Sequence, residues 1–99
     1  MAISSEIRDL WQQHTASVFP KEYGKREINR IDLPLLEAEI AGCIRLFVHG
    51  AKLDSRQIKT LRSRLIDLNT IVLFLEREDL MYFDQLRRLA DLVLQEVDQ

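Results

Sequence analysis

Apolar residues recur at steps of three and four from Ile58 to Val97, and this spacing restricts the second half of the chain to α-helix. No glycine or proline follows Gly50, so the residues that most often form turns are missing there. The alternating patterns typical of half-buried strands are also missing. The sequence predicts an all-α fold, an antiparallel helical bundle of three long helices plus a short N-terminal helix.

The 99 residues are enough for one domain, which we expect to span 1–99. We expect helices over 4–15, 33–49, 54–75 and 79–97, with a connector over 16–32.

Capping residues support these boundaries. Asp32 is suited to cap the second helix, and Pro34 fits its first turn, where a missing N–H has no partner to lose. Asp54 and Gln57 have the spacing of a capping box at the start of the third helix. Gly50 stands where a left-handed residue ends the second helix.

The connector contains two of the five turn-forming residues and a mixed cluster of charges. Such a long connection is unusual in a compact bundle. We expect Val18, Phe19 and Tyr23 to attach it to the core.

The sequence allows residues 54–98 to form either two helices joined by a turn or one continuous helix. Residues 76–79 are all charged, and we expect a tight turn there, because one helix over 54–98 would be roughly 67 Å long and too little chain would remain to cover it. The apolar steps nevertheless continue in phase through these residues, broken only by Asp79. A continuous helix paired with a second copy therefore stays open.

The second helix carries a second uncharged face. Ala38, Gly42 and Leu46 follow one another at steps of four. A glycine inside a helix costs about 1 kcal/mol relative to alanine, which is understandable if another helix approaches closely at Gly42. Either the helix over 4–15 docks there, or a partner chain does.

Further apolar residues exceed what one copy of this length can bury. Residues 71–75 are apolar on every side of their helix, so we expect them to be buried all round. Monomers rarely expose large apolar patches, and two-fold dimers are the commonest assemblies. We therefore predict a homo-oligomer, a dimer, with candidate interface residues Ala38, Gly42, Leu46, Leu73, Phe74, Met81 and Leu92.

No catalytic, cofactor or metal-binding motif is present, so we expect no enzyme, cofactor or metal. Cys43 and His49 do not share a helix face, and Cys43 fits a small buried apolar residue. His14 lies at the edge of the apolar stripe of the first helix, and Glu37 and Glu39 lie on different faces. An enzyme with a site formed between subunits stays a third hypothesis, with no residue assigned to it.

The charge balance excludes a globally basic protein, since 14 Lys and Arg face 16 Asp and Glu. The strongest local bias is a basic patch of Lys52, Arg56, Lys59, Arg62 and Arg64. No aromatic residues that stack on bases are interleaved with it. We expect a solvated face or an acidic protein partner rather than nucleic acid, whose phosphate backbone remains an alternative ligand.

The single cysteine allows no internal disulfide, and the start of the chain lacks the pattern of a signal peptide. The longest apolar run, residues 71–75, is far short of the ~20 residues that span a bilayer. We expect a cytoplasmic protein without membrane contact.

The predicted function is a small non-enzymatic protein-interaction or regulatory module that acts as a homo-oligomer; the alternative is a nucleic-acid-associated regulator that uses residues 52–64.

Overall fold

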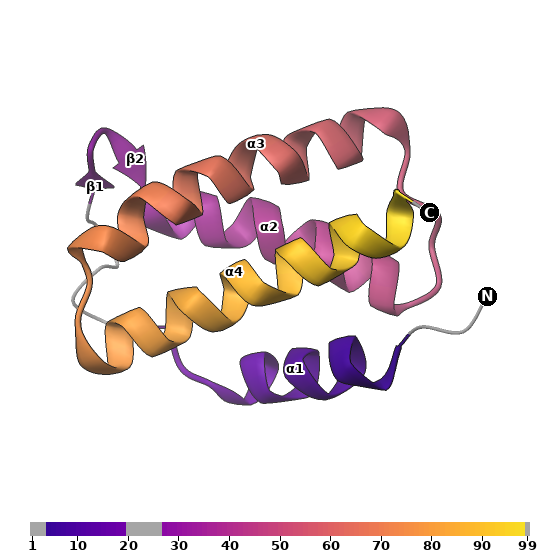
Figure 1. Ribbon diagram of the computed structural model, residues 1–99, viewed down its shortest axis with the longest axis horizontal. Helices are drawn as coiled ribbons and strands as arrows, with labels where there is room; N and C mark the ends of the chain where they lie inside the picture. The colour runs from indigo at the N-terminus through magenta and orange to yellow at the C-terminus, as the bar shows by residue number, and fades with distance from the viewer. Residues whose placement is uncertain (1–3, 20–26, 99) are drawn as a thin grey trace.

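The computed structural model describes residues 4–19 and 27–98, and these are mostly helical. Four α-helices pack against one another (Figure 1): α1 (Ser5–Ala16), α2 (Leu33–Val48), α3 (Ser55–Ile71) and α4 (Arg77–Val97). A short 3-10 helix, η2 (Val72–Phe74), follows α3. Each helix end lies within two residues of its expected position except the end of α3, which comes four residues earlier.

The caps that the sequence predicts are present. The Asp32 side chain accepts a hydrogen bond from the backbone N–H of Leu35 at 2.9 Å. At the start of α3, Asp54 accepts from the N–H of Gln57 at 2.7 Å, and the Gln57 side chain accepts from the N–H of Asp54 at 2.9 Å. This is the predicted capping box, in which two free donors of the helix end are satisfied reciprocally.

Gly50 ends α2 in the left-handed conformation, with φ of 89°. The Ala51 N–H donates to the Leu46 carbonyl at 2.9 Å, and the Gly50 N–H donates to the Phe47 carbonyl at 3.1 Å. These two bonds define a Schellman motif, which satisfies carbonyls that a helix end otherwise leaves free.

The expected connector contains a small hairpin that the sequence analysis did not predict. Strand β1 (Glu27–Ile28) pairs antiparallel with β2 (Ile31–Asp32). The two turn residues, Asn29 and Arg30, both have positive φ, as a tight two-residue hairpin turn requires. Strands of two residues are too short to show the alternating pattern by which a strand is recognised.

The chain turns between α3 and α4, so the continuous helix over 54–98 does not form. Leu75 and Glu76 are extended, and α4 then packs back against α3 (Figure 1). With no glycine in this turn, Arg77 takes the positive φ, 55°.

The expectation that residues 71–75 are buried all round is wrong. Ile71 and Leu75 are buried, but Leu73 is 80% exposed and Phe74 is 57% exposed. The reason is geometric, because α3 ends at Ile71 and the following 3-10 turn lies at the end of the molecule, where other helices do not surround it (Figure 1).

Only part of the expected attachment of the connector is observed. The Phe19 ring packs edge-on against the rings of Tyr82 and Phe83, with centroids 5.6 and 5.8 Å away. Val18 is 77% exposed, so its expected role in the core is wrong; adjacent residues of an extended chain point to opposite sides. Tyr23 lies outside the described residues.

All four helices contribute to one core, and α4 contributes most. Its buried residues follow the apolar stripe with steps of three and four that the sequence shows. The largest fully buried side chains are Ile7, Leu33, Leu36, Ile40, Ile44, Leu61, Leu68, Ile71, Phe83, Leu86, Leu89 and Val93.

Candidate functional site

One face of α2 packs in the core, and the other face is exposed. Leu36, Ile40 and Ile44 are buried. The opposite side is exposed to solvent and carries an apolar strip between Glu39 and Arg45; we call it the α2 outer face, and it consists of Leu35, Ala38, Gly42 and Leu46. Leu35 is 55% exposed and Leu46 is 41% exposed. An exposed apolar helix face is typical of a docking surface.

Gly42 makes no close contact within the fold. Apart from its two chain neighbours and the nearby backbone of α2, no heavy atom of the described residues lies within 4 Å of the position that a Cβ at Gly42 would occupy. The alternative that the first helix docks there is therefore wrong; α1 packs mainly against α4. Within the described residues, the fold of one copy supplies no reason for a glycine at this position.

A second apolar surface lies at the turn between α3 and α4. We call it the turn surface, and it consists of Leu73, Phe74 and Met81, all exposed. Leu92, which the sequence analysis grouped with them, is partly buried against the core and belongs to neither surface.

An open cavity of about 430 Å³ adjoins the turn surface. Val18 and Met81 give it apolar walls, and Glu78 and Asp79 give it an acidic rim. The sequence predicts a charged turn at 76–79 but not its place beside Val18, because the cavity brings together residues about sixty positions apart.

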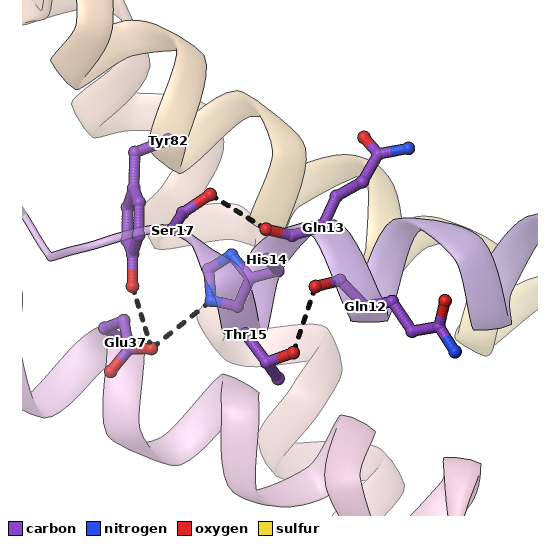
Figure 2. Close-up of polar contacts among 7 residues, drawn as sticks. All are labelled: Gln12, Gln13, His14, Thr15, Ser17, Glu37 and Tyr82. Carbon is purple, nitrogen blue, oxygen red and sulfur yellow. Dashed lines mark hydrogen bonds and ion pairs between the residues drawn. The ribbon is translucent and has the colours of Figure 1, made fainter.

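A buried polar junction joins three helices (Figure 2). His14 Nε2 of α1 lies 3.4 Å from Glu37 Oε1 of α2, and the Tyr82 hydroxyl of α4 donates to the same oxygen at 3.2 Å. His14 is only 3% exposed, although the sequence analysis placed it at the edge of the helix stripe. Its Nδ1 is buried and has no hydrogen-bond partner among the described residues.

This junction links α1, α2 and α4 through polar contacts. Burial raises the pKa of Tyr82, and the charge and hydrogen bond of Glu37 raise it further, so the phenol stays protonated and donates. Of the three residues, Tyr82 alone lines the 430 Å³ cavity. The sequence feature that could have predicted this junction is the presence of His14 and Tyr82 within apolar stripes. Their polar ring atoms need a hydrogen-bond partner when the rings are buried.

The other candidate chemical residues are separate from one another. Cys43 is buried, with Sγ 3.8 Å from the Gln57 carbonyl, as expected of a small apolar residue. Burial raises the pKa of Cys43, as do the charges of Glu39 and Asp54, so the group stays a thiol. His49 is exposed at the end of α2.

The basic patch is divided by ion pairs. Arg62 pairs with Asp98, and Arg64 Nη1 contacts Asp67 Oδ2 at 2.8 Å. The remaining members, Lys52, Arg56 and Lys59, are exposed. Arg56 and Lys59 also line a groove between α2 and α3, together with Thr60, Ser63, Arg64 and Glu39.

Within residues 4–19 and 27–98, no three His, Cys, Asp or Glu side chains gather as metal ligands would. The helices in that part of the chain are too short or too polar to cross a bilayer. Comparisons of this chain with models of protein families, with curated proteins and with solved structures found no match.

Proposed function

We propose that this chain is a small non-enzymatic helical module for protein interaction or regulation, and that it works as a homo-oligomer, a two-fold dimer. The observation that carries the proposal is the number of large apolar side chains left exposed by the described fold: Val18, Leu35, Leu46, Ile66, Leu73, Phe74 and Met81. Removal of apolar surface from water is the main favourable contribution to most protein association.

The proposal includes an antiparallel arrangement of the three long helices, with α1 beside them. Figure 1 supports it, since the chain reverses direction from α2 to α3 and again from α3 to α4. In that arrangement the turn surface lies at the end of the molecule where α2 begins. The exposed Leu35, in the first turn of α2, then lies at the same end as the turn surface.

A cytoplasmic location is also part of the proposal. The single cysteine, Cys43, is free and buried, which fits a protein that does not depend on disulfides.

Charged substitutions on the apolar surfaces test the proposal. We expect Leu46→Asp or Phe74→Asp to lower the molar mass in solution from two copies to one, while the helical circular dichroism is retained because both side chains are exposed. Asn69→Asp, at an exposed polar position of α3, is the matched control and leaves the mass unchanged. If neither apolar variant changes the mass of a two-copy species, these surfaces do not form the contact.

A second candidate function is a nucleic-acid-associated regulator. The observation that favours it is the groove lined by Arg56 and Lys59, with the hydroxyls of Thr60 and Ser63 beside them. Duplex binding by this route falls steeply with added salt, because phosphate contacts release counterions. Absence of binding to any duplex at ~50 mM salt removes this candidate, and the double variant Arg56→Ala, Lys59→Ala is the specific test if binding occurs.

A further inference from the structure

We propose that two copies of this chain meet through the α2 outer face, with their α2 helices parallel and Gly42 of each copy facing the partner's Gly42. The inference rests on the proposed homo-oligomer and names the contact within it. Leu35, Ala38, Gly42 and Leu46 offer about three turns of exposed apolar helix surface, and nothing from other parts of the described fold covers it at Gly42.

The shape of this face fits another helix. Two bulky side chains, Leu35 and Leu46, stand on either side of the small residues Ala38 and Gly42, so the face is hollow in its middle. A second helix that crosses at the hollow approaches closely, as helices do at small residues spaced four apart. Such an approach gives a reason for a glycine at a helical position where alanine would favour the helix more.

The charges beside the face identify a second α2 helix as the partner. At about 100° per residue, Glu39 and Arg45 lie three residues before and after Gly42, and therefore about 60° to opposite sides of it. Arg45 is exposed and has no carboxylate within 4.0 Å among the described residues. Glu39 has only a long contact, 3.9 Å from its Oε1 to Arg64 Nε. One edge of the face is thus acidic and the other basic.

Symmetry then selects the direction of pairing. In a parallel pair the two-fold axis runs along the helices and brings each edge against the opposite edge of the partner. Glu39 of each copy then lies beside the partner's Arg45, about 9 Å apart along the axis, a span that two extended side chains bridge. In an antiparallel pair like edges meet, so Arg45 faces the partner's Arg45, which is unfavourable.

The place of the turn surface also favours the parallel pair. A standard interface buries about 800 Å² on each partner, more than one helix face of 16 residues supplies. The start of α2 and the turn surface lie at the same end of the molecule (Figure 1). Parallel pairing brings both turn surfaces to the same end of the dimer, whereas antiparallel pairing places them at opposite ends.

Cysteine cross-linking tests the contact and its direction. In a Cys43→Ala background, which removes the only cysteine, Leu35→Cys and Leu46→Cys are each oxidised alone and as a mixture. Parallel pairing predicts that each variant links to itself. Antiparallel pairing separates identical positions by roughly 15–18 Å along the axis, so that only the mixture links. Ile66→Cys, an exposed apolar position on α3, is the control that stays unlinked.

Each outcome bears on one of the two proposals. Self-linking at both positions of a two-copy species supports the inference, and linking of the mixture alone overturns it. A two-copy species without links at either position also overturns it but leaves the proposed homo-oligomer standing. A background protein that folds and has the mass of one copy, like the unmodified chain, contradicts the homo-oligomer itself.

A charge exchange provides a second test that keeps Cys43. Parallel pairing predicts that Arg45→Glu and Glu39→Arg each raise the dissociation constant at least about fivefold, because two ion pairs become two repulsions. The double variant restores the affinity. Failure of the double variant to recover, with helical circular dichroism intact in all three proteins, contradicts the pairing of these edges.

Discussion

At the scale of single residues, neighbouring positions on α2 have different partners. Glu37 accepts hydrogen bonds from buried groups on two other helices, whereas Glu39 has one long contact with Arg64. The sequence analysis placed these two carboxylates on different faces, and the structure confirms it. It did not predict the Glu37 junction, because the partners come from positions 14 and 82, and no local pattern links them.

We expect Glu37→Ala to lower the free energy of unfolding by about 1–3 kcal/mol, because it leaves His14 Nε2 and the Tyr82 hydroxyl buried without an acceptor. Glu39→Ala, the matched control, costs less than about 1 kcal/mol. Urea unfolding followed by circular dichroism measures both. Equal losses for the two variants contradict the assigned role of the junction.

The raised pKa of Tyr82 predicts loss of stability in alkali. Above its ordinary value of 10.0, the phenol ionises in the unfolded chain but stays protonated in the folded one, so the folded state binds more protons and stability falls as pH rises. Cys43 adds the same effect above 9.0. One group contributes a slope of at most about 1.4 kcal/mol per pH unit.

Unfolding free energies of the unmodified chain and of Tyr82→Phe, measured between pH 8 and 11, check this expectation. The variant loses less stability than the unmodified chain above pH 10 because its ring has no proton to release. Parallel curves for the two proteins show that Tyr82 does not titrate as its surroundings indicate.

At the scale of elements, what the sequence predicted was local. The capping box at Asp54 and the left-handed end of α2 at Gly50 depend on residues within one turn, and both are confirmed. The end of α3 was predicted four residues too late. The apolar run of residues 71–75 indicates burial, but it does not show where the helix ends and the chain turns. The chain there turns through extended Leu75 and Glu76.

Gly42 within α2 and Gly50 just after it predict opposite effects of the same substitution. Gly50→Ala places a side chain at φ of 89° and lowers the free energy of unfolding by about 1–2 kcal/mol. Gly42→Ala meets open space and raises it by up to about 1 kcal/mol, since alanine favours helix. Chemical unfolding at protein concentrations low enough to dissociate assemblies makes the comparison.

A loss of stability for Gly42→Ala under those conditions contradicts the open environment of Gly42 within a single copy. The Gly42→Leu variant extends the comparison. The fold of one copy has room beside Gly42, so we expect the leucine side chain to leave the packing of α1 unchanged. We expect it to change the association between copies instead.

At the scale of the whole molecule, the periodicity predicted an all-α protein, and the structure confirms four helices packed against one another. Which surplus apolar residues stay exposed could not be predicted, because this depends on how the helices are placed together. Leu73 and Phe74 were expected inside and lie outside, while Leu92 lies against the core. The sequence did predict that one copy has more apolar residues than it can bury, and several of them are exposed in the described fold.

The mass of the unmodified chain in solution, measured by multi-angle light scattering across micromolar concentrations, tests the central claim most directly. The account predicts a species with twice the chain mass of 11.6 kDa, dissociating on dilution. A mass of one chain at every concentration, in a protein that is folded and soluble, contradicts it.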